Sequence, residues 1–366
     1  MQQITTFEIA GSPRERGRQY GAGLKDLIHA RDAAWRRSLE AQTGRPSEDV
    51  IDDFLRTTHF AGAIERFTPG LLEEVKGIAE GSGLGFEPIY AAQLMDEEWW
   101  LIAGEKAGHH CSSFGVAGAG GRPALAAQNM DLVDWNEGFQ VLLTIRGEAG
   151  APDQMVLTMA GMIGLCGLTS AGLGLVVNTL SQLSVRRDGL PVAFVSRGAL
   201  AAGSHDGAVA FLNRVTHASG QNYIVVGREA LSDLECSAAG AVPFARRTDC
   251  VWHTNHPLAS RDLRGGSHDH VASERNSQSR MAVLDRELGS GLMPDVSTAK
   301  RLLANRDDAA EPVSRRLGEN GSHAYTFASV VYELGPEPRV HVAAGPPCST
   351  PFKSYGFERA KRMAAE

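Results

Sequence analysis

The spacing of hydrophobic residues changes character about a third of the way along the chain. In the first hundred residues, apolar positions recur with helical periodicity and predict helices over 13–40, 60–80 and 88–101, with no convincing strand. After residue 111 the apolar residues gather in short runs that predict strands. These runs are FQVLLTIR (139–146), QMVLTMA (154–160), GLGLVVN (172–178), NYIVVG (222–227), YTFASVVYEL (325–334) and RVHVA (339–343).

Helical periodicity returns between these strands, over 191–202, 205–216 and 273–288. Turn residues such as GEAGAPD separate neighbouring strands and favour hairpins, and hence an antiparallel sheet. The elements do not alternate regularly between strand and helix, so a doubly wound parallel sheet is a poorer fit. The pattern predicts an α+β fold built as a layered sandwich, with helices covering the faces of sheets.

Composition and charge narrow the classes of partner. The 366 residues are 43% hydrophobic and 22% charged, which is typical of a globular protein with a sizeable core in one domain or two. The net charge is −7 and no Lys/Arg run exceeds a pair, so we expect neither nucleic acid nor a membrane surface as partner. No signal peptide or membrane span is evident at the amino terminus or elsewhere, and the expected location is the cytoplasm.

The stretch GHHCSSF (108–114) holds the most suggestive chemistry. Five widely spread cysteines without a CxxC pair argue against a disulfide framework or a zinc ribbon. His109, His110 and Cys111 could serve as metal ligands, but adjacent residues of a strand project in different directions, and the HTNH stretch (253–256) supplies no recognised ligand set. We therefore expect no metal and no cofactor.

Two covalent roles remain for Cys111. It could be a thiol nucleophile with a distant histidine such as His253 as base, although no spacing demands that pairing. Alternatively, the chain is cut before Cys111, whose own α-amine, with a reference pKa of about 8, then serves as the base. A cut at that point coincides with the change from helix-rich to strand-rich sequence.

Several motifs in one order resemble a known family. They are GSPRERGRQYGAGL (11–24), CSSFGVAG (111–118), AAQNMDL (126–132), AGMIGLCGLTSAGLGLVVNTL (160–180), QNYIVVGREALSDLE (221–235), WHTNHPL (252–258), TFASVVYEL (326–334) and VAAGPPC (342–348). Each motif is modest alone, but together they resemble the isopenicillin N acyltransferase-like family of autoproteolytic N-terminal nucleophile cysteine hydrolases. The resemblance implies a four-layer αββα sandwich.

The resemblance also implies roles for individual residues. Cys111 matches the cysteine that cuts the precursor after residue 110 and then becomes the nucleophile, although His110 is bulkier than the small residue at this place in the fungal acyltransferase that names the family. Asp131 matches an aspartate near the nucleophile's amine, and Asn255 an asparagine that supports the oxyanion. Asn178 is a further candidate in the same site.

For the substrate pocket, the candidates are Trp135, Phe139 and Ser329. Cleavage would divide the chain into a helical segment, 1–110, and a catalytic segment, 111–366, which together form one globular unit and a heterodimer, with a larger assembly left open. The expected activity is hydrolysis of a small N-acyl or aminoacyl amide through a thioester. The alternatives are an acyl-CoA-dependent N-acyltransferase and an unprocessed thiol hydrolase.

Overall fold

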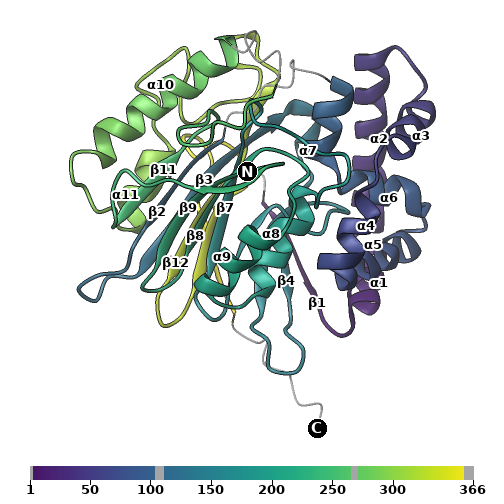
Figure 1. Ribbon diagram of the computed structural model, residues 1–366, viewed down its shortest axis with the longest axis horizontal. Coiled ribbons are helices and arrows are strands. Elements are labelled where there is room, and N and C mark those ends of the chain that lie inside the picture. The colour runs from purple at the N-terminus through teal and green to yellow at the C-terminus, as the bar shows by residue number, and fades with distance from the viewer. Residues whose placement is uncertain (1–2, 104–110, 265–270, 358–366) are drawn as a thin grey trace.

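The protein is built in four layers, with two sheets face to face and helices on both outer faces (Figure 1). The computed structural model describes residues 3–103, 111–264 and 271–357. The αββα sandwich expected from the motifs is therefore confirmed. Within the described residues, one sheet has eight strands and the other six.

The eight-stranded sheet has the order β1-β4-β5-β6-β7-β8-β9-β10 and is antiparallel except for the parallel pair β1 and β4. The predicted hairpin between the runs at 139–146 and 154–160 is confirmed as β4 and β5. The strands are β1 Thr5–Ile9, β4 Gln140–Ile145, β5 Gln154–Met159, β6 Cys166–Thr169, β7 Gly174–Thr179, β8 Gln221–Val226, β9 Leu231–Ser237 and β10 Gly240–Pro243.

The six-stranded sheet has the order β11-β2-β3-β12-β13-β14 and is antiparallel throughout. Its strands are β2 Ser112–Val116, β3 Ala124–Val133, β11 Cys250–His253, β12 Ala324–Leu334, β13 Arg339–Ala343 and β14 Lys353–Gly356. Strand β2 begins directly after Cys111, and β3 carries Asp131, so the candidate nucleophile and the candidate carboxylate lie at the same end of two paired strands.

Two sets of helices cover the outer faces. The outer face of the eight-stranded sheet shares one hydrophobic core with α8, α9 and the N-terminal helices, whereas α10 and α11 pack on the six-stranded sheet (Figure 1). The helices are α1 Pro13–Gly23, α2 Lys25–Thr43, α3 Ser47–Arg56, α4 Phe60–Phe67, α5 Pro69–Ser82, α6 Phe86–Ala92, α7 Met95–Glu98, α8 Val192–Ala201, α9 His205–Arg214, α10 Val271–Leu288 and α11 Val296–Leu303. A π-helical turn, Trp99–Ala103, follows α7.

The N-terminal region differs from the expectation of helices alone. Strand β1 lies at the edge of the eight-stranded sheet, paired with β4 in parallel from Thr5 opposite Val141 to Ile9 opposite Ile145. Only Ile9 of β1 is fully buried, because an edge strand alternates exposed and covered positions, and five residues give a weak periodic signal. The helices predicted over 13–40 and 60–80 are each interrupted, at Leu24 and at Thr68 before Pro69.

Helices α1 and α5 pack backbone to backbone. A Cβ added to Gly17 would lie 2.0 Å from the carbonyl oxygen of Glu74, and one added to Gly77 would lie 2.3 Å from that of Arg14. Gly21 and Gly81 repeat the arrangement one turn further along. Glycine is therefore required in this helix pair by the closeness of the two backbones.

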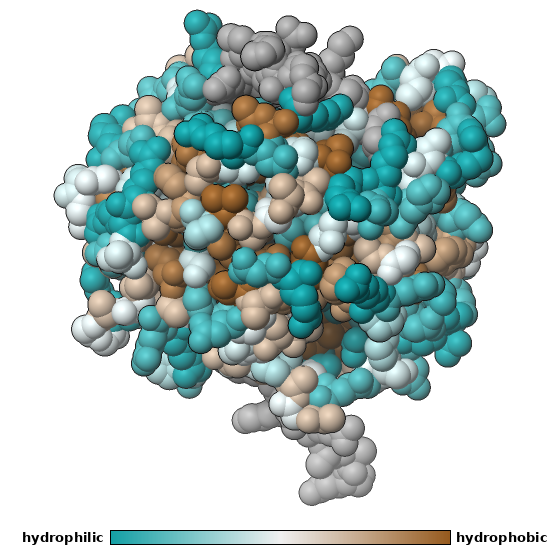
Figure 2. Space-filling view, in the orientation of Figure 1, coloured by the Kyte–Doolittle hydropathy of each residue, from teal (hydrophilic) through white to brown (hydrophobic). Residues whose placement is uncertain are grey.

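The surface is mostly polar. On the face shown in Figure 2, hydrophilic residues are mixed with smaller hydrophobic areas. The large hydrophobic side chains exposed in the described parts of the chain are the scattered residues Val242, Leu263 and Leu317. Among the helices that the structure describes, none is long and apolar enough to cross a bilayer.

Candidate active site

Cys111 lies between the two sheets at the start of β2, with 6% of its surface exposed. Burial and the neighbouring Asp131 carboxylate raise the pKa of its thiol to about 12. The backbone amide of Asp131, the charge of Arg280 and the side chain of Gln128 act in the opposite direction. In the uncut chain the sulfur is therefore a thiol at neutral pH and needs a base before it can attack.

Asp131 lies near Cys111, on β3, and is fully buried opposite Thr326 of β12. Burial raises the pKa of its carboxyl to about 6, while Arg280, the Thr326 hydroxyl and Arg315 offset part of that effect. Neither carboxylate oxygen has a hydrogen-bond donor in bonding geometry among the described residues. A buried acceptor pair without a donor is costly, so this position favours a cation beside Cys111.

Arg280, on α10, connects Cys111 with Asn255. Its guanidinium is fully buried and donates to the carbonyl oxygen of Cys111, to Oγ of Ser112 at 2.9 Å and to Oδ1 of Asn255 at 2.9 Å. Nε of Arg280 donates a further hydrogen bond to Oδ1 of Asn276, at 2.9 Å. Burial lowers the pKa of Arg280 to about 10, partly opposed by Asp131 and Cys111, so the group stays charged at neutral pH.

The orientation of the Asn255 side chain follows from these partners. Because a guanidinium only donates, the atom facing Arg280 is the amide oxygen, and Nδ2 points to the carbonyl oxygen of Thr179 at 3.0 Å. An amide nitrogen carries two hydrogens, so one N–H of Asn255 remains for a further acceptor. The Ser277 hydroxyl holds the Asn255 backbone amide at 2.7 Å. This is the arrangement expected of a preorganised oxyanion donor.

A small cavity of about 20 Å³ lies beside Cys111. Its walls come from both sheets and from the α7 region, which brings residues far apart in the sequence to one place. The lining residues are Met95, Asp96, Trp99, Cys111, Met130, Asp131, Leu132, Leu165, Val177, Thr179, Val192 and Gln221.

The side chain of Asn178 has hydrogen-bond partners on both sides of the interface between the sheets. Its Oδ1 accepts from the Ser113 hydroxyl, and its Nδ2 lies 3.4 Å from the carbonyl oxygen of His253. Asn178 therefore connects β7 of one sheet with β2 and β11 of the other. Gln128 makes a similar connection, to both backbone groups of Val177.

The interpretation of His253 as a base for Cys111 is wrong. Nδ1 of His253 lies 2.9 Å from the carbonyl oxygen of Thr254, and Nε2 lies 2.9 Å from Oε1 of Glu235. Since both neighbours are acceptors, both ring nitrogens donate, and the imidazole is cationic. Burial alone lowers the pKa of His253, but Glu235 and Asp233 raise it above its ordinary value.

The candidate pocket residues lie elsewhere. Trp135 stacks on the guanidinium of Arg31 beside the N-terminal helices, with the ring centroid 5.6 Å from Cζ. Phe139 and Ser329 are likewise not among the residues that line the Cys111 cavity, where Trp99, Met95 and Met130 form the apolar wall instead.

His109 and His110 fall outside the described residues. Metal ligation is not supported within the described ranges, which contain no group of three or more His, Cys, Asp or Glu that could hold an ion.

Sequence reasoning missed Arg280 and Asp96. Positions 276, 280, 284 and 288 are spaced four residues apart and therefore lie on one buried face of α10, next to Met281. Leu284 and Leu288 make this face apolar, whereas Asn276 and Arg280 place polar groups on it. A polar pair on the buried stripe of an amphipathic helix was an available signal. Asp96 opens three consecutive acids, DEE, within the apolar run from Leu94 to Trp100, and all three are buried.

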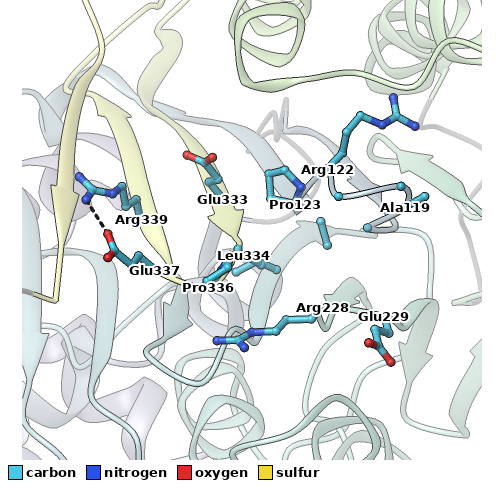
Figure 3. Close-up of a pocket in the computed structure, with 15 residues that line it drawn as sticks. Ala119, Arg122, Pro123, Arg228, Glu229, Glu333, Leu334, Pro336, Glu337 and Arg339 are labelled. Atoms are coloured by element: carbon cyan, nitrogen blue, oxygen red, sulfur yellow. Dashed lines mark hydrogen bonds and ion pairs between the residues drawn. The ribbon is translucent and has the colours of Figure 1, made fainter.

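A larger groove, of about 710 Å³, lies at the other end of the sandwich (Figure 3). It is formed by the turns that follow β2, β8 and β12, and its lining includes Arg122, Arg228, Glu333 and Arg339. Cys111 precedes β2, whereas the groove follows it, so about 17 Å of strand separates them. Its lining contains no cysteine, serine or histidine nucleophile.

Comparison with known proteins identifies the family of the chain. A model of the family "Acyl-coenzyme A:6-aminopenicillanic acid acyl-transferase" matches residues 123–346, more than half of the chain. The 40 kDa form of acyl-coenzyme A:6-aminopenicillanic-acid-acyltransferase from Emericella nidulans is 25% identical over 326 residues, covering 88% of each chain.

Solved structures with partial likeness include the Caenorhabditis elegans ortholog of N-acylethanolamine-hydrolyzing acid amidase, at 16% identity and a TM-score of 0.43, covering 62% of this chain and 93% of that one. Penicillin V acylase from Agrobacterium tumefaciens has 15% identity and a TM-score of 0.36, covering 69% of this chain and 87% of that one. The family resemblance inferred from the motifs is confirmed by the family match: this chain is an enzyme that belongs to the acyl-coenzyme A:6-aminopenicillanic acid acyl-transferase family.

Proposed function

We propose that this protein cuts itself between His110 and Cys111 and then hydrolyses a small N-acyl or aminoacyl amide through a thioester on Cys111. The observation that carries the proposal is the juxtaposition of the Cys111 thiol with the buried carboxylate of Asp131, which has no hydrogen-bond donor in bonding geometry within the part of the chain that the structure describes. A newly formed α-ammonium on Cys111 would supply the missing donor and charge. Family membership supports the same chemistry.

The two stages use the same sulfur. In the first, Sγ of Cys111 attacks the carbonyl carbon of residue 110, and the peptide C–N bond breaks to leave a thioester and the free α-amine of Cys111. Water then hydrolyses the thioester, which releases the carboxylate of residue 110 and restores the Cys111 thiol. In the second, the neutral α-amine takes the thiol proton as the sulfur attacks the substrate carbonyl. The amine then passes this proton to the departing amine of the substrate.

Hydrolysis of the acyl-enzyme completes the cycle. The α-amine accepts a proton from water as the water attacks the thioester, and the acid leaves with Cys111 restored. The proposal assigns the remaining N–H of Asn255 as donor to the oxyanion, a role supported by the bond from Arg280 that orients this amide. Asp131 is proposed to hold the α-amine in place. We further propose that segments 1–110 and 111–366 remain together as a heterodimer.

Transfer to an amine is the second candidate function. The 25% identical relative is named an acyl-coenzyme A acyltransferase, and its match covers 88% of this chain. Hydrolysis and transfer share the acyl-enzyme and differ only in whether water or a second amine takes the acyl group. Hydrolysis is favoured here because none of the described residues that line the Cys111 cavity is Lys or Arg, and such cations would be expected beside a bound CoA phosphate.

Intact mass spectrometry tests the proposal. Purified wild type should give fragments 1–110 and 111–366, whereas Cys111→Ala should remain whole and inactive. Cys166→Ala is the matched control, because Cys166 is another buried thiol whose pKa burial raises to about 12. Its chain should be cut as in wild type. A wild-type chain that stays whole while cleaving amides would contradict self-processing, and one without any acyl adduct on Cys111 would contradict the thioester.

A further inference from the structure

The cavity beside Cys111 contains a second acidic group, Asp96, which the proposed reaction does not use. Asp96 is buried at the start of α7, and burial raises the pKa of its carboxyl. The Thr179 hydroxyl and the Gln221 amide donate to its Oδ1, at 2.8 and 3.1 Å. Thr179 and Gln221 are cross-strand partners on β7 and β8, so Asp96 is held by a rigid part of the sheet.

The polar atoms left over in this cavity are acceptors. Within residues 3–103, 111–264 and 271–357, Oε1 of Gln221 is buried without a hydrogen-bond partner, as are both carboxylate oxygens of Asp131. Both residues are 0% exposed and line the same cavity as Asp96. The two charged side chains that line the cavity, Asp96 and Asp131, are therefore both carboxylates, and no Lys, Arg or His is among the described lining residues. Such a lining favours a ligand that brings hydrogen-bond donors and positive charge.

The two carboxylates can be assigned to two different cations. Asp131 approaches Cys111 from β3 and suits the α-amine of the nucleophile, as proposed above. Asp96 and Gln221 belong to the α7 region and the other sheet, so they face Cys111 from the opposite wall of the cavity. Trp99 adds an aromatic ring to this wall, a group that attracts ammonium ions.

We propose that Asp96 and Gln221 recognise an ammonium group at the end of the substrate's acyl chain, so that the preferred substrates are amides of amino acids rather than of plain fatty or aryl acids. This rests on the proposed thioester chemistry at Cys111 and names its substrate class. In the uncut chain the cavity of about 20 Å³ has room for one group of the size of water, which is also the size of an ammonium group. The unbranched side chains of Met95 and Met130 form adaptable walls for the connecting methylenes.

Paired p-nitroanilides test this with wild-type enzyme. The 3-aminopropanoyl, 4-aminobutanoyl and 5-aminopentanoyl amides are compared with the butanoyl, pentanoyl and hexanoyl amides, in which a methyl group replaces the ammonium. At least one amino member should exceed its partner in kcat/KM by about 30-fold or more, the size expected for a buried charge pair. Alkanoyl amides cleaved as well as or better than every amino partner would overturn the inference.

Variants then test which residues recognise the ammonium group of the substrate. Asp96→Asn should remove most of the preference by lowering kcat/KM for the amino member more than for its alkanoyl partner, since the substitution removes the charge pairing. Gln221→Met should weaken the preference in the same direction. Glu98→Gln is the matched control, because Glu98 is a buried carboxyl of the same helix that accepts from Trp35 at 2.8 Å and does not line the cavity. It should keep the preference.

Failure of the inference differs from failure of the proposed function. If wild type releases p-nitroaniline from the alkanoyl amides and forms an acyl adduct on Cys111, the chemistry stands and only the ammonium recognition is wrong. If neither series is cleaved and no adduct forms on Cys111, the proposed function itself is contradicted. The wild-type comparison holds even if Asp96→Asn fails to fold.

Discussion

The guanidinium of Arg280 donates a hydrogen bond to the backbone carbonyl oxygen of Cys111. The same group holds the Asn255 amide at 2.9 Å, so one buried cation fixes both the start of β2 and the candidate oxyanion donor. Helix α10, which carries Arg280, is thereby part of the active-site construction rather than only a cover for the sheet. The geometry makes Arg280 a positioning residue whose replacement should disturb two groups at once.

Replacing Arg280 should therefore affect both stability and activity. Arg280→Met removes the donor to the carbonyl of Cys111 and to the side-chain oxygens of Asn255 and Asn276, and we expect the free energy of unfolding to fall by about 3–5 kcal/mol. Arg280→Lys keeps the charge but loses the planar fork, and its kcat should fall about 10- to 100-fold with a smaller change in KM. Denaturant unfolding and steady-state kinetics measure these effects.

An exposed arginine of the same helix provides the control. Arg286 makes only exposed pairs, with Glu287 at 3.1 Å and with Asp307, so Arg286→Met should change neither stability nor kcat measurably. Equal effects of the substitutions at 280 and 286 would contradict the positioning role.

Asp131 should destabilise the uncut chain at neutral pH. Its pKa is about 6 in the folded protein against an ordinary value of 3.8, so the folded chain binds more protons than the unfolded one between these values. Stability is therefore lost as the pH rises from about 4 to 6, by on the order of 3 kcal/mol above pH 6. In a Cys111→Ala background, Asp131→Asn should raise the Tm at pH 7.5 and leave it nearly unchanged at pH 4.

The same substitution should abolish function in the Cys111 protein. Without the carboxylate, the released α-amine loses its proposed partner, and turnover should fall by about 100-fold or more. Thermal unfolding at two pH values and amide kinetics separate the two effects. A Tm that falls at pH 7.5 would show that Asp131 already has a stabilising partner in the uncut chain.

The buried pair of His253 and Glu235 should add a pH dependence of both signs. Burial alone raises the pKa of Glu235, but His253 and the amides of the 258–260 loop bring it below its ordinary value. The raised pKa of His253 contributes stability that is fully present below pH 6.5 and is lost as the pH rises through its folded value. Glu235 contributes stability above pH 4.5 that is lost on acidification.

Breaking this pair should cost several kcal/mol. His253→Gln leaves a buried carboxylate without its cation, and we expect a loss of about 3–5 kcal/mol at pH 6 and a smaller loss at pH 9. Glu235→Gln should also reduce kcat, because Glu235 holds the loop that follows Asn255. Urea titrations across pH provide the measurement, and a destabilisation by His253→Gln that grows with pH would refute the charged assignment.

Two glycines should respond to alanine with opposite signs. At Gly77, the new Cβ would lie 2.3 Å from a backbone oxygen of α1, so Gly77→Ala should separate the helices and lower stability by about 1–3 kcal/mol. Gly62, in α4, has nothing within 4 Å of an added Cβ, and Gly62→Ala should stabilise by about 0.5–1 kcal/mol. Thermal unfolding distinguishes these results, and a stabilising Gly77→Ala would contradict the close helix contact.

The spacing of hydrophobic residues along the chain was enough to predict much of the fold. The predicted strands at 139–146, 154–160, 222–227, 325–334 and 339–343 are confirmed as β4, β5, β8, β12 and β13. Edge strand β1 and strand β3 were missed, β3 because it is buried on both faces and does not alternate. Which sheet each strand joins depends on long-range pairing, as in β3 with β12, and no local pattern specifies that partner.

The site was only partly accessible from sequence. Cys111, Asp131 and Asn255 came from motif resemblance, and the structure places each beside Arg280 or the cavity. The positions of Arg280 and Asp96 in the site could not be predicted, because Arg280 lies 169 residues from Cys111 and Asp96 lies 125 residues from Gln221. Local sequence patterns do not specify contacts at such separations. The pocket candidates Trp135, Phe139 and Ser329 stay predictions; they do not line the cavity beside Cys111, and Trp135 lies in the turn after β3, where it contacts Arg31.

The parallel pairing of β1 with β4 has a consequence for how the protein could be rebuilt after denaturation. In the intact chain, β1 and its partner are tethered, and their association is independent of protein concentration. A cut before Cys111 would remove the tether, so recovery of the native sheet would become a second-order encounter of two polypeptides. Self-processing would thus turn a concentration-independent refolding reaction into a dilution-sensitive one, leaving the mature enzyme dependent on its single original folding event.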